Sequence, residues 1–306
     1  RPTGASIGIL RHAEGMTEEY GQWLASLWGN QFPFLPEGVA DCAHGAASAV
    51  APAVFTRLGG RWHFVGNTPD GLNINEGVGV MKMSYLSSVV QEKGLPVGIA
   101  YDGDADRALL TDGRGRLIDG DIMLWILGRW LAATGNIGSG VVATVMSNMA
   151  LEEHLGKENI PVHRCPVGDR YVMETMNTSG SKLGGEQSGH VIISPLVNTG
   201  DGICTGLHFL KACTALGEDI DTLADRFAPY PQILRNVEIS REKKLNRDAI
   251  DEISLEVQPL LGGLGRVLIR PSGTEPLMRI LVEAKDRRIM ENVSEILVNV
   301  IRERCR

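Results

Sequence analysis

The sequence predicts an α/β protein with two successive mixed-sheet α/β domains and a smaller α+β domain at the C-terminal end. At 306 residues, the chain is longer than one ordinary hydrophobic core. Short β-type runs alternate with helical patterns from residue 39 to about 216, as in α/β units. The pattern changes after Pro229-Tyr230-Pro231. We therefore expect domains at residues 38–136, 137–230 and 231–306, with residues 1–37 as a tail and linker of a preceding domain.

In the first part, apolar residues with helical spacing predict an amphipathic helix up to Trp28. A second helix is expected to open at residues 41–47 and to end at Gly59-Gly60. Residues 62–65 are predicted as a strand, and the Gly- and Asn-rich residues 67–79 as an irregular loop. Two more strands should flank residues 101–107, followed by a turn at 112–115 and a helix from about Asp121.

The second part should begin with a strand at residues 141–144, a helix at 149–155 and a strand at 162–164. A turn at 167–170 should lead into a helix, followed by loops at 184–190 and 198–202 and a further helix. In the last part we expect, in order, a strand at 232–239, a helix at 241–257, strands at 267–269 and 277–282, and a helix from about Asp286.

Residues 101–107 are the most informative segment, because three carboxylates alternate there with small residues between two apolar runs. They are Asp102, Asp104 and Asp106. Such carboxylates can converge on one hard cation, and oxygen ligands suit Mg²⁺ or Ca²⁺. An EF-hand would require Gly in place of Arg107 and Glu in place of Gly113, so we reject that motif. A solvated acidic turn is the plain alternative. The adjacent Arg107 favours an anionic substrate, and with it Mg²⁺.

Three other segments carry groups that can bind anions or sugars. Gly168 precedes a helix, whose free N–H groups can meet an anion. The loop at 184–190 holds Glu, Ser and His, which a structural turn does not require. The loop at 270–276 offers a guanidinium, two hydroxyls and a glycine N–H, as a phosphate requires, although a plain hairpin would also explain it.

Composition limits the class of partner. A net charge of −7 without a Lys/Arg block argues against nucleic acid, and no apolar run approaches the roughly 20 residues that span a bilayer. The five cysteines include no C-x-x-C pair, which favours a reducing cytoplasm over a disulfide framework or a zinc site. Neither G-x-x-x-x-G-K-[ST] nor G-x-G-x-x-G occurs, which disfavours a kinase or a dehydrogenase. The oligomeric state is left open.

Taken in order, these segments resemble the α-D-phosphohexomutase superfamily over essentially the whole chain. The segments that carry the resemblance are residues 41–46, 71–75, 102–107, 167–172, 185–190, 199–202 and 270–276. The resemblance implies that the three aspartates hold Mg²⁺, that Arg107 lies beside the transferred phosphoryl group and that His190 lies near the reacting centre. It also implies a set of substrate-binding residues, namely Gly168, Asp169, Arg170, Glu186, Gln187, Ser188, Arg270, Ser272, Gly273, Thr274 and Arg279.

The activity that the resemblance implies is transfer of a phosphoryl group between O6 and O1 of a hexose. The spelling of residues 167–172 and 186–188 favours an amino sugar phosphate, glucosamine phosphate. Mannose or glucose phosphate is the alternative substrate, and a non-catalytic sugar-phosphate binder is the alternative class. Family members carry a further N-terminal domain with a phosphoserine in a Ser-His-Asn type motif, which is phosphoryl donor and metal ligand. We find no such motif here and expect little turnover by this chain alone.

Overall fold

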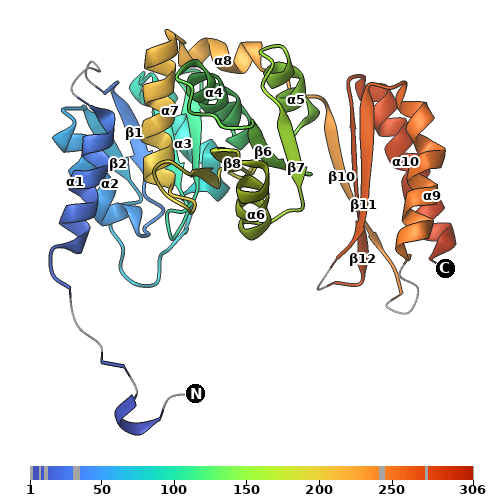
Figure 1. Cartoon of the computed structure of the whole chain (residues 1–306), viewed down its shortest axis with the longest axis horizontal. Coiled ribbons are helices and arrows are strands. Elements are labelled where there is room, and N and C mark those ends of the chain that lie inside the picture. The colour runs from blue at the N-terminus through green and yellow to red at the C-terminus, as the bar shows by residue number, and fades with distance from the viewer. Residues whose placement is uncertain are drawn as a thin grey trace. The chain divides into compact units, whose positions relative to one another are not determined.

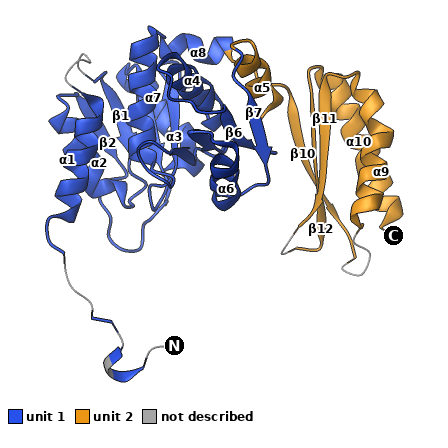
Figure 2. Ribbon diagram, viewed as in Figure 1, with its two compact units in different colours: residues 1–146, 159–226 blue, residues 147–158, 227–306 orange. Residues whose placement is uncertain are grey.

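The computed structural model describes residues 3–6, 8–9, 13–29, 35–240, 245–272 and 275–305. The chain divides into two compact units (Figure 2). Unit 1 comprises residues 1–146 and 159–226, and unit 2 comprises residues 147–158 and 227–306. The described residues form three sheets, two of mixed strand direction with helices and a smaller one with helices at the C-terminal end (Figure 1). The predicted fold class is confirmed, while the domain boundaries stay a prediction.

The first sheet of unit 1 has the strand order β2-β1-β3-β4-β5. Strand β1 pairs in parallel with β2 and β3, whereas β4 runs antiparallel to β3 and β5. Strands β1, β3 and β4 are buried along their whole length, as expected for apolar strands covered on both faces. The strands are β1 (Gly38–Asp41), β2 (Trp62–Val65), β3 (Val97–Tyr101), β4 (Ala108–Asp112) and β5 (Leu117–Ile118).

The second sheet of unit 1 has the order β7-β6-β8-β9, with β6 parallel to β7 and β8 and with β9 antiparallel to β8. The predicted loop at 184–190 is wrong at its start, because Gly184 and Gly185 belong to β8. A side chain at Gly184 would collide with Met176 and Val172 of the helix packed on this strand, so close packing rather than a turn explains this glycine. The strands are β6 (Val141–Thr144), β7 (Val162–Cys165), β8 (Leu183–Gly185) and β9 (Val191–Ile193).

Helices of unit 1 cover and connect these two sheets. Helices α3 and α7 both pack on β3 and β4, while α4 contacts β5, β8 and α7. Helix α4 is buried almost all round, as its continuous apolar sequence requires. Helix α3 lies in a stretch to which the sequence patterns assigned no element. The helices are α1 (Met16–Trp28), α2 (Ala47–Arg57), α3 (Met83–Lys93), α4 (Gly120–Ala133), α6 (Asp169–Ser179), α7 (Gly202–Leu216) and α8 (Ile220–Arg226).

Asp41 does not open helix α2, contrary to our expectation. It ends strand β1, and its fully buried carboxylate accepts hydrogen bonds from the N–H groups of Ala43 (3.0 Å) and Gly79 (2.7 Å). The helix begins only at Ala47. An aspartate favours helix starts because its oxygens accept backbone N–H bonds, and here the same chemistry stabilises a loop instead.

Unit 2 contains an antiparallel sheet of order β10-β12-β11, with α9 and α10 against one face (Figure 1). Helix α5 belongs to this unit as well, since the N–H of Met149 donates to Oε1 of Glu283 at 2.7 Å. The elements are α5 (Met149–Gly156), β10 (Gln232–Glu238), α9 (Arg247–Val257), β11 (Gly265–Pro271), β12 (Leu277–Ala284) and α10 (Arg287–Arg304). Short 3₁₀ turns in the two units are η1 (Gly4–Ser6), η2 (Val80–Lys82) and η3 (Gln258–Leu261).

The helix predicted at 241–257 is shorter than expected. Residues 241–244 lie outside the described residues, and α9 begins at Arg247. Asn246 precedes it, and its side-chain oxygen accepts a hydrogen bond from the N–H of Ala249 at 2.9 Å. This N-cap fixes where the helix starts, which the charge pattern of the segment did not indicate. Among the described helices of the chain, none has the length and apolarity to cross a bilayer.

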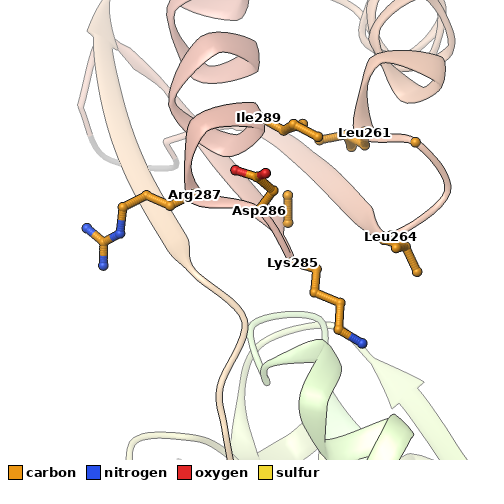
Figure 3. A pocket seen from close by; sticks show the side chains of 8 residues that line it. Leu261, Leu264, Lys285, Asp286, Arg287 and Ile289 are labelled. Atoms are coloured by element: carbon orange, nitrogen blue, oxygen red, sulfur yellow. The ribbon is translucent and has the colours of Figure 1, made fainter.

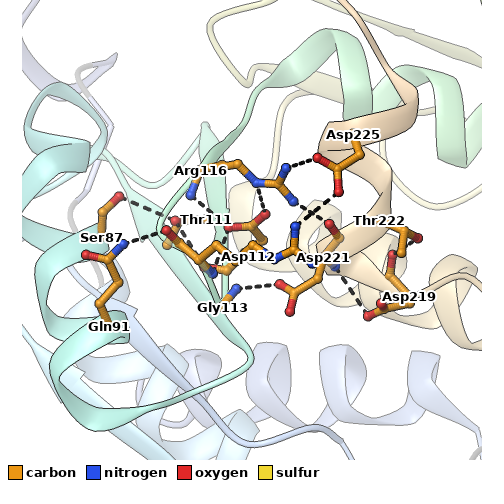
Figure 4. A network of polar contacts seen from close by, with 11 residues as sticks. Ser87, Gln91, Thr111, Asp112, Gly113, Arg116, Asp219, Asp221, Thr222 and Asp225 are labelled. Atoms are coloured by element: carbon orange, nitrogen blue, oxygen red, sulfur yellow. Dashed lines mark hydrogen bonds and ion pairs between the residues drawn. The ribbon is translucent and has the colours of Figure 1, made fainter.

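A polar network fixes the turn between β4 and β5 to the helical segment around α8 (Figure 4). Asp112 is fully buried, and its carboxylate accepts hydrogen bonds from the backbone N–H and from Nε of Arg116, both at 2.7 Å. Asp221 accepts the N–H of Gly113 at 2.8 Å, and Arg116 also pairs with Asp225. Strand β4 is therefore anchored at the end opposite to the acidic loop.

We predict that Arg116→Met lowers the free energy of unfolding by about 2–4 kcal/mol, because it leaves a buried carboxylate without its guanidinium partner. The measurement is urea unfolding. Arg114→Met is the matched control on the same turn, since the Arg114–Asp225 pair (3.2 Å) is exposed on both sides and should contribute much less than the pair that includes the buried Asp112. Equal losses in the two variants would contradict the role given to Asp112.

Candidate active site

The three aspartates of the loop between β3 and β4 converge on one point. One carboxylate oxygen from each of Asp102, Asp104 and Asp106 lies within 4.8 Å of the others. Ala105 makes the turn between them with a φ of 62°, in the left-handed region. Its N–H donates to the carbonyl of Asp102 at 3.2 Å. A small residue tolerates this backbone, although glycine would adopt it with less strain.

The charges of this loop are not balanced by the protein alone. The pKa of Asp102 is raised to about 6, mainly by burial and also by the neighbouring Asp106 and Asp104, while a hydrogen bond from the backbone N–H of Arg107 opposes the rise. Arg107 Nε lies 3.5 Å from Asp102 and 3.7 Å from Asp106. Oδ1 of Asp106 is buried and has no hydrogen-bond partner in the part of the chain that the structure describes. Three carboxylates facing one guanidinium fit an additional hard cation with oxygen ligands, such as Mg²⁺.

His190 lies against the same loop. Its backbone forms an isolated antiparallel bridge with Arg107, and its Nε2 is 3.7 Å from a carboxylate oxygen of Asp106. His190 is 4% exposed, and among the described residues its Nδ1 has no hydrogen-bond partner. The structure therefore brings together the two predicted catalytic residues and the three predicted metal ligands.

Glycines let two further loops approach the acidic loop through their backbones. The N–H of Gly202 donates to the carbonyl of Ala105 at 2.8 Å, and the carbonyl of Gly189 accepts the N–H of Ala108 at 3.2 Å. A side chain at Gly189 or Gly202 would overlap the backbone carbonyl of Ala108 or Arg107, respectively. These glycines are needed for close packing beside the aspartates.

A pocket of about 520 Å³ in unit 1 contains the predicted sugar-binding residues Glu186, Gln187 and Ser188. One oxygen of Glu186 accepts the N–H of Gly168 at 2.8 Å, and the other accepts the Ser188 hydroxyl at 3.2 Å. The side chains that line the pocket are Leu117, Asp119, Thr144, Met146, Val167, Glu186, Gln187 and Ser188. A carboxylate, an amide and a hydroxyl beside apolar walls suit a sugar.

Asp119 is a pocket residue that the sequence analysis missed. It is the N-cap of α4, accepting hydrogen bonds from the N–H groups of Asp121 (3.1 Å) and Ile122 (3.2 Å). Its other oxygen accepts Nε2 of Gln187 at 3.2 Å, and burial raises its pKa. The only local signal was an aspartate at a helix start, which is the ordinary signature of a cap.

The predicted binding residues at the start of α6 make mostly local contacts. The N–H of Gly168 donates to Oε1 of Glu186, so it helps to hold this pocket side chain in place. Asp169 accepts the N–H of Arg170 at 2.7 Å, and Nε of Arg170 donates to Glu174 at 2.7 Å. None of these three predicted residues is among the described residues that line the pocket.

In unit 2, two arginines lie side by side on neighbouring strands. Arg270 of β11 stands directly opposite Arg279 of β12, and Asn236 of β10 stands opposite Arg279 on the other side. The alternating residues Met278 and Ile280 are buried in the core with α9 and α10, so the arginine pair faces away from these helices. Like charges at directly opposed positions repel, which favours an anion between them.

The loop after Arg270 is described only in part. Ser272 is 4% exposed, and its hydroxyl accepts the N–H of Glu275 at 3.2 Å. Arg279 donates to Glu275 at 3.2 Å, while its Nε has no hydrogen-bond partner among the described residues. Gly273 and Thr274, which we also predicted to bind phosphate, lie outside the described residues.

Another hollow of unit 2, of about 490 Å³, contains none of the predicted residues (Figure 3). Leu261, Leu264 and Ile289 give it an apolar wall, and Lys285 and Arg287 extend from it in different directions. It therefore has a different character from the polar pocket of unit 1.

Comparison with protein families agrees with this geometry. Residues 119–230 match the family model described as phosphoglucomutase/phosphomannomutase, alpha/beta/alpha domain III, and residues 234–300 match its C-terminal domain. The chain belongs to the phosphoglucomutase/phosphomannomutase family, which confirms the resemblance found in the sequence.

Within the family, the chain is similar to phosphoglucosamine mutases. The protein of that name from Leifsonia xyli subsp. xyli is 43% identical over 309 residues, which cover 99% of this chain and 67% of the relative. The one from Bacillus velezensis is 38% identical over 304 residues, covering 99% of this chain and 68% of the relative. The chain thus spans about two thirds of the length of these relatives.

Solved structures show the same fold at low sequence identity. Aspergillus fumigatus N-acetylphosphoglucosamine mutase in complex with GlcNAc-6P and magnesium has a TM-score of 0.78 and 18% identity, over 97% of this chain and 67% of that chain. A phosphoglucomutase/phosphomannomutase family protein from Burkholderia thailandensis has a TM-score of 0.74 and 17% identity, over 94% and 64% of the two chains.

We predict that the affinity of the chain for Mn²⁺, used as a probe of the carboxylates, falls about tenfold from pH 7 to pH 5. The pKa of Asp102 is raised to about 6, so this group is mostly ionised at pH 7 and mostly protonated at pH 5, where a proton competes with the cation. Titration followed by electron paramagnetic resonance measures the affinity. In Asp102→Asn the affinity should be lower and nearly independent of pH over this range. An unchanged pH dependence in that variant would refute the assignment to Asp102.

Proposed function

We propose that this chain is the metal-, sugar- and phosphate-binding part of a phosphoglucosamine mutase, which interconverts glucosamine 6-phosphate and glucosamine 1-phosphate through a bisphosphorylated sugar. The observation that carries the proposal is the carboxylate cluster with Arg107 and His190, which occurs in the same unit as the polar pocket of Glu186 and Ser188. Relatives that are 38–43% identical and carry this name support it. Related solved structures hold GlcNAc-6P with magnesium or glucose 1,6-bisphosphate, which agrees with the proposed substrate class.

The proposed chemistry depends mainly on positioning and on charge neutralisation. Mg²⁺ bound by Asp102, Asp104 and Asp106 would neutralise the charge that develops on the transferred phosphoryl group. Arg107 places a guanidinium beside the same carboxylates and binds the phosphoryl oxygens. Nδ1 of His190, which has no partner among the described residues, can exchange a proton with a nearby sugar hydroxyl.

The sugar and the second phosphate are assigned to different groups. Glu186 accepts hydrogen bonds from sugar hydroxyls in the pocket of unit 1, and Ser188 can donate or accept. The paired guanidinium groups of Arg270 and Arg279, with Ser272, bind the phosphate that is not transferred. Gly273, Thr274 and the residues Gly168, Asp169, Arg170 and Gln187 stay in the proposed binding set. A sugar that binds in two orientations requires one such fixed phosphate site.

Mg²⁺ is the proposed cofactor, and a phosphorylated amino sugar is the proposed partner. The net charge of −7 argues against nucleic acid. A cytoplasmic location, the absence of membrane contacts and an oligomer stay predictions. The alternative substrate is a mannose or glucose phosphate, as in the enzymes that give the family models their name. A non-catalytic sugar-phosphate binder is the alternative class.

We expect the chain to bind glucosamine 6-phosphate at least about tenfold more tightly than mannose 6-phosphate, because the amino group at C2 adds a charged hydrogen bond worth about 1.5–3 kcal/mol. Isothermal titration in the presence of Mg²⁺ measures both affinities. The reverse preference would favour the phosphomannomutase alternative.

We expect Arg279→Met to lower the affinity of the chain for both sugar phosphates about tenfold or more, because it removes a contact to the phosphate. Arg247→Met, which changes an exposed arginine in the same unit, is the matched control and should change neither.

We also predict negligible mutase turnover by residues 1–306 alone. The resemblance assigns phosphoryl donation to a phosphoserine, and loss of a nucleophile lowers turnover by about 10³-fold or more. The assay compares the chain with a full-length phosphoglucosamine mutase at equal concentration. Turnover comparable to that of the full-length enzyme would show that the donor assignment is wrong.

A further inference from the structure

Helix α1 is tied to the edge of the candidate active site by one side chain. The hydroxyl of Tyr20 donates a hydrogen bond to Oδ2 of Asp201 at 2.7 Å. The Tyr20 ring stacks on Trp23 with centroids 5.8 Å apart, and the helix buries Leu24 and Trp28 while packing on α2 and α7. These contacts restrict the conformation of the Tyr20 side chain, so its hydroxyl stays next to Asp201.

Asp201 links the Tyr20 hydroxyl to the first turn of helix α7. Its second oxygen, Oδ1, accepts the N–H of Cys204 at 2.9 Å, so the residue is the N-cap of the helix. Burial raises the pKa of Asp201, and the bonds from Cys204 and Tyr20 oppose this effect by stabilising the carboxylate. Because the side chain is largely removed from water, loss of either donor leaves a lone pair without a partner.

The backbone of residues 200–202, which we call the wedge, packs against the acidic loop. The N–H of Gly202 donates to the carbonyl of Ala105 at 2.8 Å. At Gly200, even a single methyl group would collide with the ring of His190 and approach the carbonyl of Asp106. A displacement of this wedge therefore shifts the ring of His190 and the backbone of the metal-binding carboxylates together.

We propose that Tyr20 is a positioning residue of the mutase site: by holding Asp201, it fixes the wedge at 200–202 against the metal-binding loop and His190. The inference rests on the proposed function, since that function gives the acidic loop its role. It assigns to helix α1, outside both sheets, a direct part in the geometry of phosphoryl transfer. The hydroxyl is the essential group, whereas the ring serves packing.

The test is Tyr20→Phe, which removes the hydroxyl and keeps the ring. Hydrogen exchange by mass spectrometry follows the peptides around residues 102–108 and 198–206, and Mn²⁺ titration by electron paramagnetic resonance follows the carboxylates. We expect faster exchange in both peptides and about three- to tenfold weaker Mn²⁺ binding, the scale of one hydrogen bond to a charged group.

Lys211→Met is the matched control. Lys211 Nζ donates to the carbonyl of Leu27 at 2.6 Å, so it ties the other end of α1 to α7 without contacting the wedge. This variant should lower thermal stability but leave exchange in the two peptides and Mn²⁺ affinity unchanged. Equal changes in both variants, or none in Tyr20→Phe, would overturn the positioning role. If the unmodified chain binds no Mn²⁺, the proposed function fails, and the exchange data alone decide for or against the role of Tyr20.

Discussion

Mutual repulsion of Asp102, Asp104 and Asp106 is the constraint on which the site depends. Carboxylates within 4.8 Å of one another repel by on the order of 3 kcal/mol per pair at an effective dielectric constant of about 20. The single guanidinium of Arg107 offsets only part of this. The loop can hold such a cluster because both flanking strands are fully buried and β4 is anchored at its far end by Asp112. A rigid support keeps charges together that would otherwise separate, and a cluster of this kind can hold a cation.

The rigidity comes largely from backbone packing. Gly45, Gly189 and Gly202 each place a backbone where a side chain would overlap a carbonyl of the acidic loop or of the strand that follows it. Backbone contacts at these positions leave the loop few alternative conformations, and backbone hydrogen bonds join each of these segments to the loop or to the start of β4. The glycine-rich segments of the sequence therefore serve the site indirectly. The side chains between them, Glu186, Ser188 and His190, are the ones that we propose to act on the substrate.

The sequence indicated the features that depend on local pattern. Strands at 62–65 and 141–144 and the acidic loop between two apolar runs lie where alternation and buried runs predicted them. Features that depend on tertiary contacts were not predictable. In the sequence, Asp119 looks like an ordinary helix N-cap. Its hydrogen bond with Gln187 forms only in the folded chain. The opposition of Arg270 and Arg279 depends on strand register, which no single segment encodes. The contact between Tyr20 and Asp201 joins residues 181 positions apart.

The net charge of the chain is negative, whereas the proposed ligand, a phosphorylated sugar, is an anion. The net charge of −7 repels an anion at long range, but this field is screened beyond roughly 8–10 Å at physiological ionic strength. Within that distance, the charged groups nearest to a ligand determine whether it is attracted or repelled. Arg107 stands beside the aspartates in unit 1, and Arg270 and Arg279 face each other in unit 2. The carboxylates of unit 1 attract a cation, whereas the arginine pair of unit 2 attracts an anion. Which ion each cluster attracts therefore depends on where the charges are placed and not on their sum.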